Sequence, residues 1–495
     1  MFRSLALFVA FLATSFSTAH ASEFFDKLID RARHSATQAY AKEQPVPDTS
    51  KLGYDAYRGI RFRPESILWR DTGRFHVEFF PTGFLYQTPV KIYVIQRSHT
   101  SAAAGAATAL SASPEMFDFG AVTPPANVGF AGFKITNPLN GQKFDEIVSF
   151  LGASYFRPIG KGQAYGASAR GLAIDTAQPR SEEFPEFREF WLVEPAPGDT
   201  SMTIYALLES PGASGAYAFT VTPGSRTTVD VDARLFMRHG VSMLGIVPLT
   251  SMFLSGKSGP WRDDFRPEVH DSDGLALLTG GGERIWRPLR NPGSLQVSSF
   301  VDNNPRGFGL LQRERQFVHY QDTVAKYQTR PGLWVEPKGD WGEGEVRLVE
   351  IPTPSEYHDN IAAFWVSKWP VEKGKPLEYR YRLSALSDEA ALSPQARVVA
   401  TRQGPVDGNS KARRLVVEFE GDTLTNLPEQ RLVESNVEVT GGKLLWAEID
   451  RTPGSTSRRL FIDIEPESRR TAEIRAFLTA DGKRLSETFT IQLRP

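Results

Sequence analysis

Short runs in which apolar and polar residues alternate recur along most of this chain. In the clearest of them, Phe75, Val77 and Phe79 alternate with Arg74, His76 and Glu78. A period of two places the apolar side chains on one face of a strand, so each run predicts a half-buried β-strand. Further runs stand at 90–95, 202–208, 217–221 and 227–232, and the 34 Pro and 41 Gly separate them as turns. Because no strand–helix alternation accompanies them, the pattern favours one very large β-sandwich over a doubly wound nucleotide-binding sheet.

Helical spacing appears in few places. Apolar residues recur every three or four positions after residue 24, which predicts a helix that ends before Pro45; they are Phe25, Leu28, Ile29, Ala32, Ala36, Ala39 and Tyr40. Two short helices are also expected, near residues 145–151 and 185–190.

The first 21 residues have the features of a secretory signal peptide. Arg3 gives a basic start, an apolar run extends from Leu5 to Phe16, and Ala19-His20-Ala21 is a small-x-small cleavage site. The apolar run is shorter than the roughly 20 residues that a membrane-spanning helix requires. No twin Arg precedes it, so we expect export by the general secretory route, without stable insertion in the membrane.

Composition narrows the compartment and the partners. The chain has no Cys, which excludes a thiol nucleophile, thiolate zinc sites and iron–sulfur clusters. A large core can dispense with disulfides, so an exported chain without Cys fits a bacterial periplasm. The formal net charge is −1 at pH 7, which gives no basic bias toward nucleic acid or an anionic membrane.

A shift in composition predicts a domain boundary near residue 390. Eight of the nine Trp lie at or before Trp369, and all eight His lie at or before His358. Beyond a polar stretch, six alternating runs follow at 415–419, 433–439, 444–449, 460–464, 474–478 and 488–493. We therefore expect a large β-sandwich over 22–390, a linker over 391–400 and an immunoglobulin-like sandwich over 401–495, with the chemistry in the large domain.

Motifs for metal-dependent hydrolysis, serine nucleophiles and phosphate binding do not occur: HExxH, GxSxG and the P-loop are missing. What remains is carboxylates set among aromatic residues, in segments 266–274, 280–287 and 350–365. Aromatic faces stack on pyranose rings, and carboxylates bind sugar hydroxyls or hydrolyse glycosidic bonds in pairs. A single Asp before Asn or Gly is nevertheless more often a turn former, and Trp286 is more often a core residue.

Several long strings resemble the periplasmic glucan biosynthesis protein family of the G/D type. They are 129–134 (GFAGFK), 145–157 (DEIVSFLGASYFR), 165–176 (YGASARGLAIDT), 248–253 (PLTSMF), 266–274 (RPEVHDSDG), 285–289 (IWRPL), 307–313 (GFGLLQR) and 334–342 (WVEPKGDWG). The resemblance extends from about residue 50 to the C-terminus, and the plain signal peptide is similar to the G side.

The resemblance implies a large N-terminal β-sandwich of the galactose-mutarotase-like type and a C-terminal immunoglobulin-like domain. It also implies a role in making osmoregulated periplasmic glucans with a β-1,2-linked glucose backbone. Some members, chiefly on the D side, are inverting β-1,2-glucan hydrolases. Their two functional carboxylates match Asp271 and Asp359 here, with Asp359 as the acid and Asp271 as the base.

Three functions remain open from the sequence. The protein hydrolyses or remodels β-1,2-glucan at these two acids, it binds and presents the nascent backbone without catalysis, or its second domain docks onto the inner-membrane glucan synthase. No cofactor and no metal are expected. We expect one long open cleft, with substrate contacts from Trp286, Arg287, Tyr357, Trp334, Asp273 and Glu283.

Overall fold

The computed structural model describes residues 10–46, 52–71, 73–97, 107–257, 259, 263–389, 392–428, 430–468 and 470–493, and of helix α1 it describes the side chains from Glu23 onward. The fold is mainly β, with 49% of residues in strands and 8% in helices. This confirms the expected class. The chain forms two compact units, one of Met1–Gly162, Ala169–Pro248 and Trp369–Ser384, the other of Gln163–Ser168, Leu249–Lys368 and Ala385–Pro495.

The first unit is a sandwich of two sheets. One sheet runs β14-β13-β12-β11-β3-β4 and the other β2-β6-β7-β8-β9. Their bounds are β2 His76–Pro81, β3 Lys91–Ile95, β4 Ala107–Leu110, β6 Phe130–Asn137, β7 Asp145–Leu151, β8 Tyr155–Pro158, β9 Ser168–Arg170, β11 Glu186–Val193, β12 Met202–Glu209, β13 Ala213–Thr222 and β14 Thr228–Met237. Phenylalanines fill the space between the sheets: Phe150 of β7 contacts Phe190 of β11 and Phe219 of β13 edge-on, at 5.5 and 5.2 Å.

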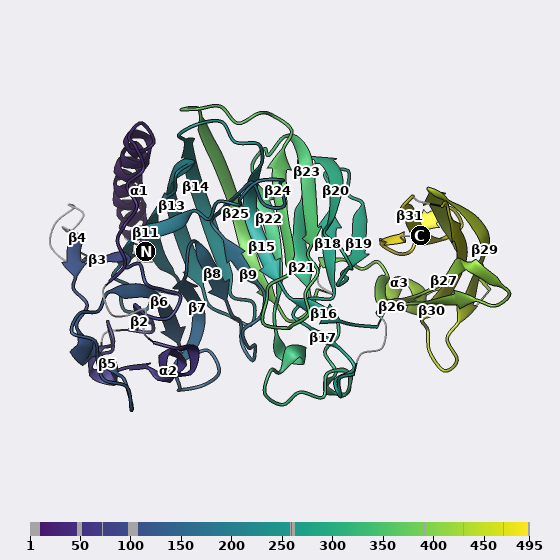
Figure 1. The fold of residues 1–495 in the computed structure, drawn as a ribbon, viewed down its shortest axis with the longest axis horizontal. Helices are drawn as coiled ribbons and strands as arrows, with labels where there is room; N and C mark the ends of the chain where they lie inside the picture. The colour runs from purple at the N-terminus through teal and green to yellow at the C-terminus, as the bar shows by residue number, and fades with distance from the viewer. Residues whose placement is uncertain are drawn as a thin grey trace, which may run out of the picture. The chain divides into compact units, whose positions relative to one another are not determined.

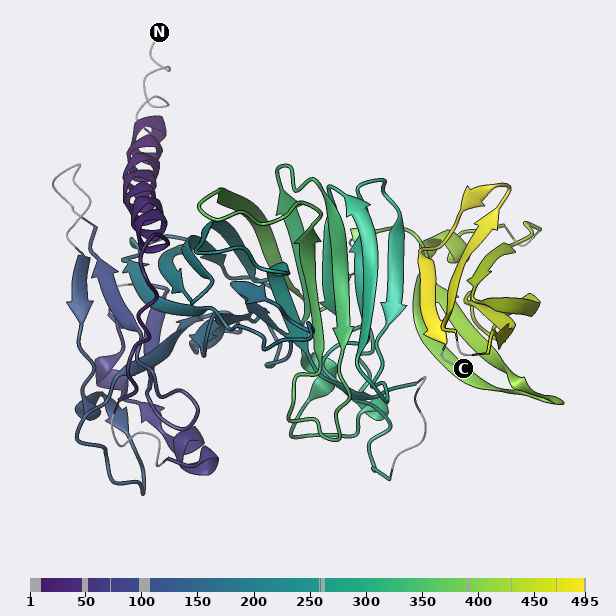
Figure 2. The same cartoon turned by 45° about the horizontal axis from the view of Figure 1, so that its top comes forward.

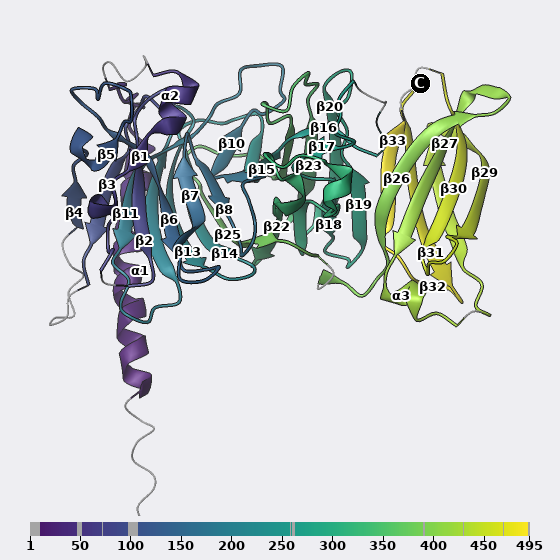
Figure 3. The same cartoon turned by 90° about the horizontal axis from the view of Figure 1, so that it is seen from below.

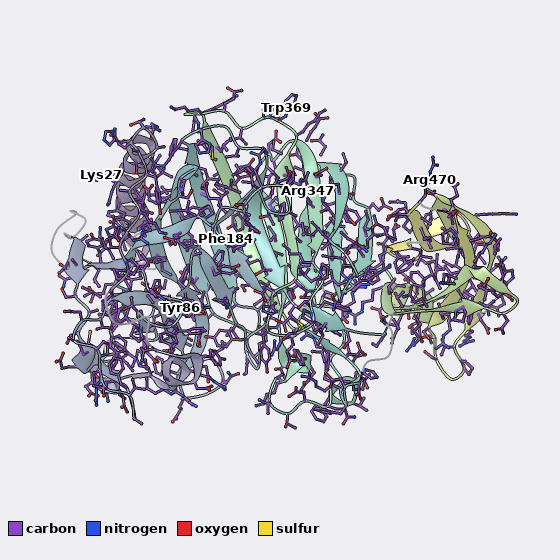
Figure 4. All side chains as sticks on the ribbon, viewed as in Figure 1. Lys27, Tyr86, Phe184, Arg347, Trp369 and Arg470 are labelled. Carbon is purple, nitrogen blue, oxygen red and sulfur yellow. The ribbon has the colours of Figure 1, made fainter. Side chains whose placement is uncertain are left out.

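Helix α1 (Ala10–Ser35) lies against strands β12, β13 and β14 of the first unit (Figure 1). Its buried face carries Leu28 and Ala32, which pack with Trp191 and Tyr205. Its outer face carries Lys27, which is ion-paired with Glu23 (Figure 4). The predicted helix is therefore confirmed over residues 25–35, and it ends ten residues before Pro45.

The two predicted short helices are wrong. Residues 145–151 form strand β7 and residues 186–193 form strand β11. Residues 147–150 and 189–192 are buried in succession, so these parts of the two sequences lack the alternation that marks a half-exposed strand. A short segment with several adjacent apolar residues fits a buried strand and a helix equally well, and here the sheet partners decide.

The second unit contains two further groups of strands. One sheet portion orders β24-β23-β20 and another orders β19-β18-β21-β22. Their bounds are β18 Gly274–Leu278, β19 Arg284–Pro288, β20 Gln296–Asn303, β21 Gly307–Leu311, β22 Gly332–Lys338, β23 Glu343–Glu350 and β24 Ile361–Ser367. The short strands β16 (Phe253–Ser255) and β17 (Val269–His270) pair beside the loops at one end of these strands (Figure 2).

The C-terminal strands of this unit form a sandwich, and each of the six predicted runs after residue 414 overlaps one of its strands. A four-stranded sheet runs β26-β27-β30-β29, and β28-β31-β33 lies behind it (Figure 3). The bounds are β26 Arg397–Val406, β27 Asn409–Glu420, β28 Glu434–Thr440, β29 Gly442–Arg451, β30 Arg458–Pro466, β31 Ala472–Ala480 and β33 Thr488–Leu493. Strand β33 also pairs in parallel with β19, at Ile285–Thr488 and Trp286–Phe489. The boundary at 391–400 stays a prediction.

Among the described residues, no helix is both long and apolar enough to cross a membrane.

A close backbone approach in β21 gives a test of this packing. A methyl group on Gly309 would meet the Leu333 carbonyl oxygen and lie 3.0 Å from the Trp334 Cα, whereas Gly293 has open space around it. Because overpacking costs about 1–3 kcal/mol, Gly309→Ala should lower the melting temperature by several degrees, measured by scanning calorimetry. Gly293→Ala is the matched control and should melt with the wild type; equal melting of both variants would contradict the packing of β21 against β22.

Candidate active site

Asp271 is fixed by its own backbone in the turn between β17 and β18. Its amide N–H donates to the carbonyl of Met252 at 2.8 Å. Its side chain is only 6% exposed and forms an ion pair with Arg330. One carboxylate is therefore fixed inside the unit, between the turn that follows β17 and the loop that precedes β22.

Asp359 lies two residues before the start of β24, and its neighbour Asn360 determines its position. The amide N–H of Asn360 donates to the carbonyl of Ser251 at 3.1 Å. Its buried side chain accepts from the Phe253 N–H at 2.8 Å and donates to the Phe253 and Ile351 carbonyls at 3.0 Å. Asp359 itself is exposed. The three residues from Ser251 to Phe253 thus anchor both predicted acids, which brings Asp271 and Asp359 to the same part of the molecule.

The electrostatics of Asp271 confirm that the two acids are near each other. Burial, which Arg330 opposes and the negative charge of Asp359 reinforces, raises the pKa of Asp271 to about 6. A carboxyl group with such a pKa ionises close to neutral pH, which suits acid–base chemistry.

A network of polar side chains connects Asp271 to the loop that precedes Asp359. The Arg330 guanidinium lies 4.3 Å from the ring centre of Tyr327. The Tyr327 hydroxyl donates to Glu356, and Arg266 donates to the same carboxylate at 2.7 Å. Burial, followed by the hydrogen bond to Glu356, raises the pKa of Tyr327 well above its ordinary range, so this hydroxyl remains a donor at any working pH. The network ties three loops together around the two acids.

Two exposed aromatic rings flank this network. Tyr357 follows Glu356 and is 87% exposed, and Phe265 precedes Arg266 and is 76% exposed. The Arg266–Glu356 ion pair therefore brings both rings to the same exposed edge of the site, which we call the rim. Tyr357 is a predicted contact residue. The sequence reasoning missed Phe265 and Arg330: Phe265 sits in a run of charged residues, and Arg330 lies 59 positions from its partner.

A second, buried cluster lies beside Asp271 in sequence. His270 is fully buried between Gln312, at 2.9 Å, and Glu268, at 3.1 Å. Burial opposes its charge, but Asp273 and Glu268 together raise the pKa of His270 above its ordinary value. This cluster fixes the direction of strand β17 and hence of Asp271.

Two overlapping sets in this cluster have the donor types of a cation site. Their ligand atoms lie within 4.8 Å of one another; the sets are Glu268, His270 and Asp273, and Glu268, Glu314 and His319. The Lys257 ammonium already supplies positive charge there, 2.6 Å from Glu314 and 3.8 Å from Glu268. We therefore assign no metal, and the expected absence of one stays a prediction.

Three of the other predicted contact residues are buried inside the second unit. Trp286 and Trp334 are each 3% exposed and belong to the apolar core shared with the C-terminal strands. Arg287 is buried and ion-paired with Glu473, at 2.6 Å. These side chains offer no face to solvent in this structure, so sugar contact by them stays a prediction.

Two predicted carboxylates are likewise bonded within the unit. Glu283 accepts from Arg475 at 2.8 Å, Arg484 at 3.0 Å and Thr488 at 2.6 Å. Asp273 accepts the backbone N–H of Glu314 at 2.7 Å. The structure thus brings Asp271, Asp359 and Tyr357 together at one site, whereas Glu283 and Asp273 accept hydrogen bonds from other residues of the second unit.

The raised pKa of Asp271 makes a prediction about stability. Between about pH 4 and 6 the folded state binds a proton at Asp271 that the unfolded chain has released, so this residue's contribution to stability falls as pH rises. As the pH rises over that range, the wild type should lose roughly 3 kcal/mol of unfolding free energy relative to Asp271→Asn, and the loss should level off above it. The melting temperatures of the two proteins, measured at each pH, report this change. The exposed Asp407→Asn is the control, and a difference that is flat with pH would contradict the burial of Asp271.

Comparison with known proteins identifies the family of the chain. The profile of the family described as "Periplasmic glucan biosynthesis protein, MdoG" matches residues 24–493. The chain is 44% identical over 475 residues to "Glucans biosynthesis protein G 1" of Shewanella oneidensis, covering 94% of this chain and 86% of the relative. It is 43% identical over 477 residues to "Glucans biosynthesis protein G" of Shewanella baltica, with coverage of 94% and 86%. This chain therefore belongs to the periplasmic glucan biosynthesis protein family.

Proposed function

We propose that this protein hydrolyses the β-1,2-linked glucose backbone of periplasmic glucans by inversion and so remodels the polymer during its biosynthesis. The observation that carries the proposal is the anchoring of Asp271 and Asp359 by the one segment Ser251–Phe253. Glycoside hydrolysis needs two carboxyl groups at fixed positions, and a shared backbone anchor supplies that rigidity. The relatives' names support a role in glucan biosynthesis, and the family name together with the predicted signal peptide supports work in the periplasm.

The two acids have different surroundings, which supports different roles. Asp271 is buried and paired with Arg330, and its pKa of about 6 leaves it ionised yet still basic at neutral pH, as a general base requires. Asp359 is open to solvent and can meet the glycosidic oxygen of a bound chain.

Each step of the proposed reaction balances. The Asp271 carboxylate takes a proton from a water molecule while the water oxygen forms a bond to the anomeric carbon. The bond from that carbon to the glycosidic oxygen breaks on the opposite face, and Asp359 gives its proton to the departing oxygen. One water is consumed, two shorter glucans leave, and proton exchange with solvent restores both acids.

The rim of the site fits a polymer. Tyr357 and Phe265 present exposed rings on which glucose units can stack, and the Arg266–Glu356 pair between them offers hydrogen-bonding groups. A chain can lie across such a rim without threading an end into a closed pocket. A protein that only binds and presents glucan would use the same rim, so activity separates the two functions.

Substitution of the acids tests the proposal. Asp359→Asn and Asp271→Asn should each lower the release of reducing ends from linear β-1,2-glucan by about 10²–10⁴-fold, because each removes one proton transfer. Wild-type activity should rise with pH through about 6, as Asp271 ionises. Asp407→Asn, an exposed acid in the β26–β27 turn, should retain full activity. Full activity of Asp359→Asn, or an inactive wild type that still binds glucan, would favour the binding function instead.

A further inference from the structure

The outward face of the sheet β26-β27-β30-β29 carries an exposed tryptophan within a row of polar side chains. The strand register places Arg414 of β27 opposite Asp463 of β30, and Asp463 opposite Trp446 of β29. In β27 the residues 415, 417 and 419 are buried, whereas 414, 416 and 418 are partly exposed, so this row belongs to the outer face. The three side chains thus form one line across three strands.

A bulge in β29 puts Trp446 on that face. Leu444 pairs with the buried Ile464 and Trp446 pairs with Asp463, so Leu445 is an extra residue between two adjacent partners. A bulge re-aims the side chains that follow it. Without it, position 446 would fall on the core side. The local backbone therefore departs from regular pairing in the place that turns this ring, which is 41% exposed, toward solvent.

The neighbours of Trp446 hold it and supply oriented polar groups. The Arg414 guanidinium lies 5.3 Å from the ring centre of Trp446 and binds Asp463 through two hydrogen bonds, at 2.7 and 2.6 Å. The Phe461 ring lies 6.4 Å from that of Trp446. A bidentate pair of this kind fixes both side chains, so less entropy is lost when a ligand binds to them.

Several charges of this face are paired with one another. Arg459 and Arg402 lie 3.2 and 3.7 Å from the carboxylate of Glu418. Arg414 lies 2.6 Å from the carboxylate of Asp463. A charged peptide or an anionic surface would have to compete with these pairs. A neutral ligand rich in hydroxyl groups can accept and donate hydrogen bonds at the same groups and stack its C–H face on the aromatic ring.

We propose that the outer face around Trp446, Arg414 and Asp463 is a second, non-catalytic binding surface for a neutral β-linked glucan. The identity of the ligand rests on the proposed function. One glucose unit stacks on the exposed face of Trp446, and its hydroxyls bond to Arg414, which the buried Asp463 holds in place. A long chain held there remains at a high effective concentration near the same molecule, which would favour long glucans over short oligosaccharides.

Affinity electrophoresis tests this surface without requiring hydrolysis. The mature chain with Asp359→Asn, which leaves the polymer intact, is run in gels that contain linear β-1,2-glucan. Adding Trp446→Ala should weaken the retardation by about ten-fold in apparent affinity, and Trp446→Phe should restore most of it. Trp369→Ala is the matched control, because Trp369 is 63% exposed but belongs to the other compact unit.

The outcomes are distinct from those of the hydrolysis assay. Unchanged retardation of Trp446→Ala, or the same loss from Trp369→Ala, would overturn the proposal and leave the face to a protein partner. No retardation of any variant would also overturn it. An inactive wild type whose retardation still depends on Trp446 would overturn hydrolysis alone.

Discussion

The hydrogen bonds made by the backbone of Ser251, Met252 and Phe253 are the constraint on which the site depends. Met252 accepts from the amide of Asp271, and Ser251 accepts from the amide of Asn360. The Asn360 side chain then satisfies both polar groups of Phe253, as a neighbouring strand would. Buried backbone groups must be paired, so this small region has one low-energy arrangement and it fixes the position of each acid. The catalytic roles that we propose follow from this geometry.

Burying Asp271 is costly unless its charge is balanced, and the surrounding network provides that balance. Arg330 pairs with it, Tyr327 lies against Arg330, and Glu356 and Arg266 extend the network to the rim. Removing one member of such a network leaves a buried polar group unpaired. The same network therefore positions Asp271 and holds the loops that carry the exposed aromatic rings.

The C-terminal strands are part of this frame as well. The Arg313 backbone N–H donates to Asp273, while its guanidinium binds Glu487 at 2.6 Å and lies 3.4 Å from the ring centre of Trp286. One buried arginine thus connects the turn that follows Asp271 to strand residues near the C-terminus. The core that contains Trp286 and Trp334 is continuous with the C-terminal sandwich. These contacts explain why the two Trp are buried when their sequence context suggested a sugar-binding role.

The sequence predicted the strands of the exposed sheets well, because alternation reports directly on a half-buried face. It failed at 145–151 and 185–190, which belong to strands whose central residues are buried on both faces. For the site, the resemblance identified Asp271 and Asp359, and local context identified Tyr357. Arg330, Tyr327 and Phe265 could not be found in that way, because their importance arises from contacts between loops that lie far apart in the chain. The exposure of Trp446 depends on a single bulge, which no pattern in the strand sequence predicts.

The most direct test of the central claim is the anomeric form of the first product. Linear β-1,2-glucan and the purified mature protein are followed by proton NMR before mutarotation is complete. An inverting pair of acids predicts that the newly formed reducing ends appear first as the α-anomer, and that Asp359→Asn forms them far more slowly. Initial formation of the β-anomer would show retention and contradict the roles given to Asp271 and Asp359, and the absence of new reducing ends would contradict hydrolysis altogether.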